Sequence, residues 1–248
     1  MLVGQSSVFL STLGVIKKVA NSTLPVLFVG ESGTGKGLLA RYLHEISNRA
    51  DQPLVTLNCS SLNDSLLESE LFGYEKGAFT GATKRSIGKF EAANGGTLFL
   101  DEVCDMSLTM QAKFLRALDD GKFYRVGGAQ LIQSDVRIVS ATNKQVGREV
   151  KCKNFRSDLL FRICGLVVTV PPLRDRKEDI VLIANYFLKE CSKLWSLNGI
   201  YFSDYSLEML KEHDWLGNIR ELKISIERAV LLRDSNEIDI DPFDITKF

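Results

Sequence analysis

The sequence predicts an α/β fold in which a parallel sheet is flanked by helices, followed by a small helical domain. Between residues 24 and 172, short continuous apolar runs alternate with helical patterns, and this alternation is typical of a parallel sheet with crossover helices. From the stretch PPLRDR at 171–176 onward only helical patterns are expected. We therefore place a boundary near Pro172, which gives domains of residues 1–172 and 173–248.

Five short segments are expected to be strands. The run LPVLFVG at 24–30 is apolar and stops at a glycine, as a strand buried on both faces would. The other four are PLVTLN at 53–58, GTLFLDE at 96–102, VRIVSATN at 136–143 and LVVTVP at 166–171. Each is followed by polar residues or by proline, so functional side chains are expected where the strands end.

Helical periodicity fills the segments between and after these strands. Residues 37–47 place Leu39, Tyr42, Leu43 and Ile46 on one stripe, and residues 107–121 form a second helical pattern. Beyond the boundary, helices are expected in 177–195, with Ile180, Ile183, Ala184, Phe187 and Leu188 on one face, and in 203–213 and 218–233. The tail at 235–248 is expected to be loosely held.

Composition excludes several classes of protein. Lys plus Arg and Asp plus Glu number 31 each, which argues against a surface that coats DNA, although a local basic patch stays open. No apolar run approaches the roughly 20 residues of a membrane span, and no signal pattern precedes the first helix. The five cysteines form no C-x-x-C, and only two histidines accompany them. We therefore expect neither zinc site nor disulfide framework, no membrane partner, and a cytoplasmic protein.

The motif GESGTGKG at 30–37 predicts a phosphate-binding loop between a strand and a helix. Its glycines let successive backbone N–H groups point at a β-phosphate, while Lys36 reaches the β and γ oxygens. The final Ser or Thr of the usual motif is Gly37 here, so the hydroxyl that often binds Mg²⁺ is missing. The nucleotide-binding residues are expected to be Gly30, Glu31, Ser32, Gly33, Thr34, Gly35, Lys36, Gly37 and Leu38.

Acidic and amide side chains end two of the predicted strands. Asp101 is expected to hold Mg²⁺ directly or through water, and Glu102 to polarise a water toward the γ-phosphate. Asn143 would lie beside the same phosphate as a polar sensor, although a turn residue at a strand end fits equally well. Together these motifs predict an ATP-binding, Mg²⁺-dependent site rather than a glycine-rich turn.

Two further stretches lie apart from these motifs. NFRSDLLFRI carries Arg156 and Arg162 six residues apart, and either they are surface residues or one or both reach the nucleotide of a neighbouring subunit. The stretch GYEKGAFTGATK at 73–84 fits neither a helix nor a strand pattern. Its glycines free the backbone, so Phe79 is either exposed for a partner or packed back into the core of its own chain.

The chain resembles the AAA+ central domain of bacterial sigma-54-dependent transcriptional activators, also called enhancer-binding proteins. Six motifs occur in that family's order over almost the whole chain: GESGTGKG, ELFGYEKGAFTGA, GGTLFLDE, FRSDLLFRI, PPLRDR and WLGNIREL. The most specific of them is the hexapeptide G-A-F-T-G-A. The resemblance implies an AAA+ P-loop NTPase fold with a helical lid domain, and an ATPase that forms hexameric or heptameric rings and remodels RNA polymerase bound to sigma-54.

The resemblance also implies roles for individual residues. Lys36 would contact the phosphates, Asp101 the magnesium, and Glu102 the water, while Asn58 resembles the switch residue that holds this glutamate in an inactive pose. Arg156 and Arg162 match arginines donated to a neighbouring subunit, and Arg220 matches the lid arginine that senses nucleotide in the same chain. The sigma-54 contact would be made by Gly77, Ala78, Phe79, Thr80, Gly81 and Ala82.

Two positions depart from the family pattern. Gly37 replaces the usual Glu, which predicts a looser first helical turn because Gly is a poorer helix former by up to about 1 kcal/mol. Leu216 replaces the proline of W-P-G-N, so the turn before Arg220 is expected to be less constrained. No receiver or helix-turn-helix pattern is found, so DNA contact is expected only through a module outside this chain. The alternatives are another AAA+ remodeller and a nucleotide-gated binding module without turnover.

Overall fold

The computed structural model describes residues 2–240 and 242, which form two compact units. The sheet unit comprises residues 15–29 and 36–169. The lid unit comprises the described residues within 1–14, 30–35 and 170–248. The boundary predicted near Pro172 falls beside the start of the last lid segment at Val170, and it stays a prediction.

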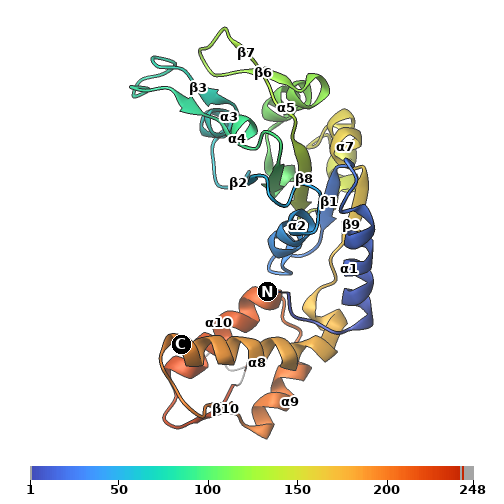
Figure 1. Ribbon diagram of the computed structural model, residues 1–248. Helices are drawn as coiled ribbons and strands as arrows, with labels where there is room; N and C mark the ends of the chain where they lie inside the picture. The colour runs from blue at the N-terminus through green and yellow to red at the C-terminus, as the bar shows by residue number, and fades with distance from the viewer. Residues whose placement is uncertain (1, 241, 243–248) are drawn as a thin grey trace. The chain divides into compact units, whose positions relative to one another are not determined.

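A five-stranded parallel sheet forms the centre of the sheet unit, with the strand order β2-β5-β8-β1-β9 (Figure 1). The strands are β1 (Val26–Val29), β2 (Leu54–Asn58), β5 (Thr97–Asp101), β8 (Arg137–Thr142) and β9 (Leu166–Thr169). Every residue of the central strand β8 is buried, as expected for a parallel strand covered on both faces. All five strands coincide with segments predicted from the sequence.

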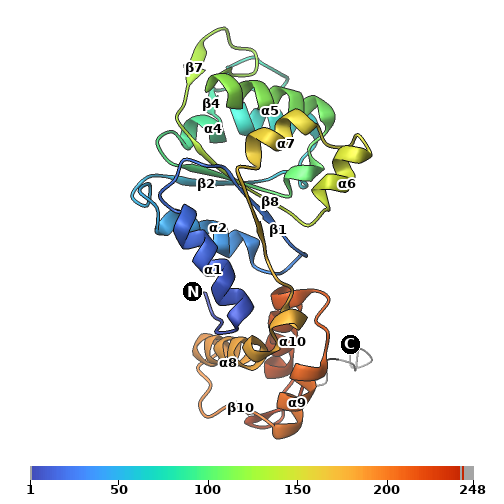
Figure 2. The same ribbon diagram turned by 90° about the vertical axis from the view of Figure 1, so that its right-hand side faces the viewer.

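Helices cover the two faces of this sheet (Figure 2). Helix α2 (Lys36–Glu45) lies on one face, and α5 (Leu108–Asp120) and α7 (Ser157–Ile163) lie on the other. Ser107 caps the start of α5, because its Oγ accepts a hydrogen bond from Met110 N, and the helix buries Met110, Phe114 and Ala117 at helical spacing. The remaining helices of this unit are α3 (Asp64–Phe72), α4 (Lys89–Ala92), α6 (Val146–Lys151) and a 3₁₀ turn at Val103–Asp105. α1 (Ser7–Val19) begins in the lid unit and ends in the sheet unit.

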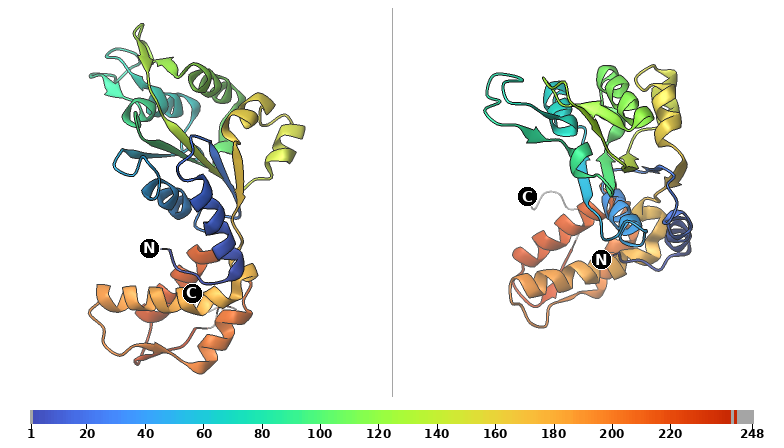
Figure 3. Two further views of the ribbon diagram at one scale, coloured as in Figure 1. Left: turned by 45° about the vertical axis from the view of Figure 1, so that its right-hand side comes forward. Right: turned by 45° about the horizontal axis from the view of Figure 1, so that its top comes forward.

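Two short hairpins extend from the same end of the sheet unit. One pairs β3 (Gly73–Tyr74) with β4 (Ser86–Ile87), and the other pairs β6 (Lys122–Tyr124) with β7 (Leu131–Gln133), both antiparallel. A bridge between Tyr74 and Val126 joins them, and they lie side by side in both views of Figure 3. The G-A-F-T-G-A hexapeptide lies between β3 and β4.

The lid unit is built on three helices around its own core. They are α8 (Lys177–Leu194), α9 (Asp204–Glu212) and α10 (Asn218–Leu231), preceded by a 3₁₀ turn at Leu173–Arg176. Ile180, Leu210, Leu222 and Ile226 are fully buried in this core. Of the stripe predicted for 177–195, Phe187 is only partly buried. Along α2, likewise, Ala40 and His44 are buried while Tyr42 and Ile46 are half-buried.

The N-terminal segment is attached to the lid core by one buried carboxylate. Asp179, which has no exposed surface, accepts hydrogen bonds from Gln5 N (2.6 Å), Ser6 N (2.9 Å) and Ser6 Oγ (2.7 Å). These donors lie directly before α1, so the carboxylate satisfies amides that the helix itself leaves unpaired. This contact joins the segment before α1 to the core of the lid unit.

Two sequence expectations for the lid are wrong. Strands do not stop at residue 172, because β10 (Tyr201–Phe202) and β11 (Glu237–Ile238) pair in parallel. The start of the tail is not loosely held, since Ile238 and Ile240 are buried and Ile240 N donates to Ser206 Oγ at 2.7 Å. Alternating apolar residues in this polar stretch fill the lid core. Residues 241 and 243–248 lie outside the described part of the chain.

The parallel sheet flanked by helices and the helical lid confirm the predicted architecture. All five cysteines are free thiols in the structure. Across residues 2–240 and 242, no helix has the length and apolar character needed to cross a membrane.

Candidate functional site

The phosphate loop over residues 30–35 has a backbone that requires glycine. Gly33 and Gly35 have φ values of +78° and +96°, in the left-handed region. A Cβ on Gly33 would lie 2.2 Å from the carbonyl oxygen of Gly217, and Ile219 N donates to Gly33 O at 3.0 Å. The loop therefore packs directly against the start of α10 within the lid unit.

Glu31 fixes the same loop through charged and amide partners. Arg174 Nη1 and Nη2 donate to its two carboxylate oxygens at 2.8 and 2.5 Å, and Asn218 Nδ2 donates to Oε2 at 3.1 Å. The Arg174 guanidinium, together with Asn218, lowers the pKa of Glu31 to about 2. The sequence motifs PPLRDR and WLGNIREL contain both partners, but sequence reasoning assigned no role to either. Glu31 thus holds the loop rather than facing outward from it.

Asn218 organises the turn in which Leu216 replaces proline. Its Oδ1 accepts from Leu173 N at 2.7 Å, and its Nδ2 also donates to Ser32 O at 3.0 Å. Trp215 and Asn218 have positive φ values of 49° and 56°, so this turn is unusual for non-glycine residues. Leu216 itself is 77% exposed. The looser turn expected from the missing proline is opposed by these hydrogen bonds.

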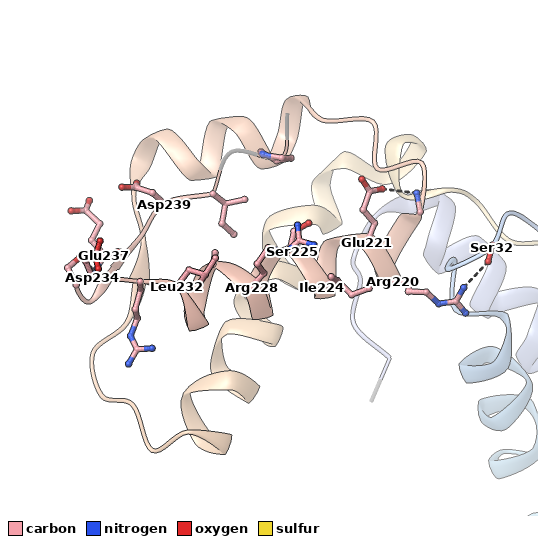
Figure 4. A pocket seen from close by; sticks show the side chains of 16 residues that line it. Ser32, Arg220, Glu221, Ile224, Ser225, Arg228, Leu232, Asp234, Glu237 and Asp239 are labelled. Carbon is pink, nitrogen blue, oxygen red and sulfur yellow. Dashed lines mark hydrogen bonds between the residues drawn. The ribbon is translucent and has the colours of Figure 1, made fainter. Parts of the chain in front are cut away.

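Arg220 extends from the first turn of α10 to the phosphate loop. Its Nη1 donates to Ser32 Oγ at 2.9 Å, as the dashed line in Figure 4 shows. The two residues lie at one end of a cavity of about 690 Å³, whose other end includes Leu232, Asp234 and Glu237. The arginine expected to sense nucleotide is therefore already in contact with the loop expected to bind it.

In the sheet unit, Lys36 begins α2 and points toward the end of β5. Its Nζ lies 3.7 Å from Glu102 Oε1, and the two side chains are 6% and 16% exposed. Glu102 Oε2 accepts a hydrogen bond from Asn143 N at 2.9 Å. The ends of β5 and β8 thus bring together three residues that the sequence separates by 41 positions or more. The Asn143 contribution is made by its backbone, whereas a side-chain role was predicted.

Glu102 itself occupies a strained backbone conformation. Its φ and ψ of 51° and 49° lie in the left-handed region, which costs a non-glycine residue roughly 1–2 kcal/mol. Such strain is concentrated at functional sites, where the surrounding structure holds the side chain in a required direction. The conformation turns the carboxylate from the strand end toward Lys36.

Asn58 does not hold Glu102 in this structure. Its Oδ1 accepts from Ser60 N (2.9 Å) and Ser60 Oγ (2.8 Å), and no hydrogen bond joins Asn58 to Glu102 among the described residues. Asn58 lies opposite Asp101 in the β2–β5 register, one residue short of the glutamate. The pose expected from the switch role is therefore not the one observed.

Asp101 and its surroundings fit a magnesium ion. Asp101 and Asn58 line a cavity of about 240 Å³ together with Gly37 and Thr56. Mg²⁺ keeps several waters and is commonly held by one or two carboxylates plus phosphates, so a single aspartate at the edge of an open cavity suits it. Within the described residues no group of three or more His, Cys, Asp or Glu side chains could form an all-protein metal cage.

The two candidate trans arginines are bound to carboxylates of their own chain. Arg156 precedes α7 and makes two bonds to Asp158, Nε to Oδ1 at 3.0 Å and Nη2 to Oδ2 at 2.7 Å, and it lowers the pKa of that carboxyl. Arg162, in the last turn of α7, donates to Leu118 O at 2.8 Å and lies 3.4 Å from Asp119. Both guanidinium groups are about half exposed. Because both guanidinium groups are exposed to solvent, they are accessible to other partners.

The hexapeptide forms a tight turn in which Phe79, Thr80 and Gly81 are exposed, whereas Ala82, also predicted to contact sigma-54, is buried. Gly77 N donates to Ala82 O at 2.8 Å, and Gly77 and Gly81 have φ values of +84° and +103° with no atom within 4 Å of a Cβ at either. Backbone conformation, not space, requires these glycines. Phe79 is 44% exposed and its ring lies 4.9 Å from that of Tyr74. The Phe79 side chain is therefore partly exposed to solvent and packs against Tyr74 on one side.

A buried arginine joins this loop to the second hairpin. Arg125 is 5% exposed, and it donates to Glu75 Oε1 at 2.7 Å and to Glu91 Oε1 at 2.8 Å. Val126 N donates to Gly73 O and Glu75 N to Val126 O at 2.9 and 3.0 Å. The base of the hexapeptide loop is therefore fixed to the β6–β7 hairpin. Sequence reasoning missed Arg125, because its two carboxylate partners lie 50 and 34 residues away.

Comparison with protein families agrees with this geometry. Residues 2–169 match the family described as "Sigma-54 interaction domain", and residues 174–245 match "AAA+ ATPase lid domain". The chain belongs to the sigma-54 interaction domain family. The resemblance noted from the motifs is thereby confirmed.

Curated members of the sigma-54 interaction domain family resemble this chain closely. The transcriptional regulatory protein ZraR of Salmonella typhimurium is 49% identical over 93% of this chain and 52% of the relative. The Nif-specific regulatory protein of Rhodobacter capsulatus is 47% identical over 94% of this chain and 40% of the relative. The chain spans about half the length of the curated relatives it matches.

Several solved structures show the same fold. NtrX from Brucella abortus in complex with ATP superposes with a TM-score of 0.87 at 36% identity, over 93% of this chain and 52% of that one. The complex of NtrX with ADP gives 0.91 at 34% identity, over 100% and 56% of the two chains. Hsp104 matches at 19% identity with a TM-score of 0.62, over 94% of this chain and 49% of that one, and it shares the fold alone. The predicted AAA+ fold class is confirmed.

Proposed function

We propose that this chain is a Mg²⁺-dependent ATPase that acts in the cytoplasm as a ring of identical subunits and remodels RNA polymerase bound to sigma-54. The observation that carries the catalytic part is the placement of Lys36, Asp101 and Glu102 at neighbouring ends of α2 and β5, with Lys36 and Glu102 3.7 Å apart. The ATP and ADP complexes of NtrX support nucleotide binding by the same fold.

Each residue has a distinct chemical task in this proposal. The amides of residues 30–37 and Lys36 bind the β- and γ-phosphates, and Asp101 holds the magnesium, which neutralises charge on the transferred phosphoryl group. Glu102 accepts the proton of the attacking water. Arg220 contacts the loop from the lid, where a change in its bond to Ser32 would report the nucleotide state.

The neighbouring subunit supplies a cation in this proposal. Arg156 and Arg162 are exposed on and beside α7, and an arginine provided in trans accelerates phosphoryl transfer by about 10³–10⁵-fold. The turn at 77–82 presents the exposed Phe79 to sigma-54. The proposed sigma-54 contact and the proposed nucleotide site thus lie on different surfaces of one chain.

Phosphate release measured over a range of protein concentrations tests this function. Specific activity is expected to rise as subunits assemble, and Arg162→Ala is expected to stay inactive at every concentration. A constant specific activity, down to concentrations at which light scattering shows monomer, contradicts the trans arginine. No release at any concentration favours a nucleotide-gated binding module. Capture of sigma-54 with ADP and aluminium fluoride separates this activator from other AAA+ remodellers.

A further inference from the structure

The contacts of Arg162 within its own chain have a second consequence. Its Nη2 donates to Leu118 O at 2.8 Å, and its Nε lies 3.4 Å from Asp119 Oδ1. Leu118 and Asp119 belong to the last turn of α5, which ends at Asp120. A cation at this end satisfies a free carbonyl and complements the helix dipole. Arg162 therefore fixes the end of α5.

The end of α5 is also the root of the β6–β7 hairpin. Gly121 ends the helix with φ of +60°, and β6 begins at the next residue. Ser134 N, which follows β7, donates back to Gly121 O at 3.0 Å. Both strands of the hairpin are thus attached at Gly121, three residues from Leu118. A displacement of the last turn of α5 must move or loosen the hairpin.

The hairpin in turn holds the base of the hexapeptide loop. Val126 N bonds Gly73 O, Glu75 N bonds Val126 O, and Arg125 binds Glu75 at 2.7 Å. An unbroken series of hydrogen bonds and one helix turn therefore connects Arg162 to the loop that displays Phe79. Every link lies inside the sheet unit.

We propose that Arg162 exchanges between two partners, and that this exchange couples a neighbour's nucleotide to the position of the hexapeptide loop. In one state it binds Leu118 O and Asp119 of its own chain. In the other it binds the γ-phosphate on a second copy of this chain, which releases the end of α5. Asp119 is a positioning residue in this scheme. The inference rests on the proposed function in one respect, the trans role of Arg162.

The relative strengths of the two contacts permit such an exchange. The side chains of Arg162 and Asp119 are 50% and 55% exposed, and an exposed ion pair changes an equilibrium constant by no more than about fivefold. A trans arginine contributes about 10³–10⁵-fold to phosphoryl transfer. The phosphoryl group therefore outcompetes the carboxylate in the transition state of transfer, when a neighbour is in place. By linkage, a partner that holds the loop also biases where Arg162 binds.

Hydrogen–deuterium exchange on the monomer tests whether Arg162 stabilises the end of α5 and the two hairpins of its own chain. Without nucleotide, Arg162→Ala is expected to speed amide exchange several-fold in residues 121–134 and 73–82. Asp119→Asn should speed it less, since the contact between Arg162 and Leu118 O is retained. Asp119→Glu keeps the carboxylate and should exchange at wild-type rates. The matched control is Asp120→Asn, an exposed carboxylate in the same helix turn that forms no ion pair among the described residues. Equal rates in all variants would overturn the proposal.

The same measurement on the assembled ring tests the exchange itself. With ADP and aluminium fluoride, the wild type is expected to gain exchange in both segments, and Arg162→Ala to show no further gain. If Arg162→Ala hydrolysed ATP at the wild-type rate, its trans role and the exchange would both be wrong. If Arg162→Ala were inactive while nucleotide left wild-type exchange unchanged, only the coupling would be wrong.

Discussion

Lys36 Nζ lies 3.7 Å from Glu102 Oε1, so the cation expected to bind phosphate and the carboxylate expected to activate water are paired with each other. Both side chains are largely buried, which strengthens their attraction relative to a surface pair. A bound nucleotide has to separate them, because the phosphates compete with Glu102 for the ammonium group. The same displacement would free the carboxylate to accept a proton.

This competition predicts opposite effects of one substitution on binding and on turnover. Glu102→Gln removes the charge that competes for Lys36, so ATP should bind at least as tightly as to the wild type. Hydrolysis should fall by roughly 10²–10⁴-fold, because the general base is lost. Equilibrium titration with a fluorescent ATP analogue and a phosphate-release assay measure the two. Glu45→Gln, at the far end of α2, is the control and should change neither. Turnover at the wild-type rate would show that another residue positions the water.

Gly37 should tolerate a side chain, whereas Gly33 should not. Gly37 lies in the first turn of α2, and a Cβ there would meet only the Phe99 ring at 3.7 Å, an ordinary contact. Gly37→Ala should therefore stabilise the chain by about 0.5–1 kcal/mol, or roughly 1–4 °C in Tm. Gly33→Ala should be strongly destabilising, because of its positive φ and the Gly217 carbonyl at 2.2 Å. Calorimetry of both variants checks this, and a lower Tm for Gly37→Ala would contradict the expected helix effect.

The ion pair of Glu31 predicts a pH-dependent stability. Its pKa is lowered from 4.5 to about 2 in the folded chain by Arg174 and Asn218. The carboxylate therefore stabilises the fold above pH 4.5, and this contribution is lost as the pH falls toward 2. Because the side chain is 42% exposed, we expect under about 1 kcal/mol.

Urea unfolding of the wild type and Glu31→Gln at several pH values measures this difference. The gap between the two should be largest near neutral pH and should close below pH 4.5. Glu212→Gln, an exposed carboxylate at the end of α9, should show no such gap. A gap that stayed constant with pH would mean that charge at Glu31 does not contribute.

Phe79 should matter for partner capture and little for stability. It is 44% exposed and contacts Tyr74 on one side, so Phe79→Ala should cost about 1 kcal/mol or less. Phe114→Ala, at a fully buried site on α5, should cost about 3–5 kcal/mol. Thermal unfolding and sigma-54 capture, measured on the same variants, separate the two roles. Thr80→Ala, at another exposed position of the turn, should likewise lose capture while keeping its Tm.

An unexpectedly large fall in the Tm of Phe79→Ala would place the ring in the core. A normal Tm with normal capture would instead assign the sigma-54 contact to another surface. Hydrolysis should remain measurable in both loop variants, because the loop lies outside the residues proposed to bind nucleotide.

Several features of this protein are determined by its sequence alone. The five strands, the helices between them and the phosphate loop follow from local patterns, since apolar periodicity and glycine placement act over a few residues. The glycines at 33, 77 and 81 indeed have the positive φ that their motifs predict. Asp101 and Glu102 could be assigned because parallel strands place their carboxyl ends at one edge of a sheet.

Only the tertiary structure decided which partners these residues have. Glu31 meets Arg174 and Asn218 from 143 and 187 residues away, Lys36 meets Glu102, and Arg162 meets the end of α5. Burial of Ile238 beside β10 likewise makes a short strand, Glu237–Ile238, at the start of the tail that was expected to be loosely held. Such contacts depend on how distant segments pack, and the free energy of that packing is not encoded in any local pattern. The sequence therefore predicts which side chains form the site, whereas the tertiary structure determines which residues those side chains contact.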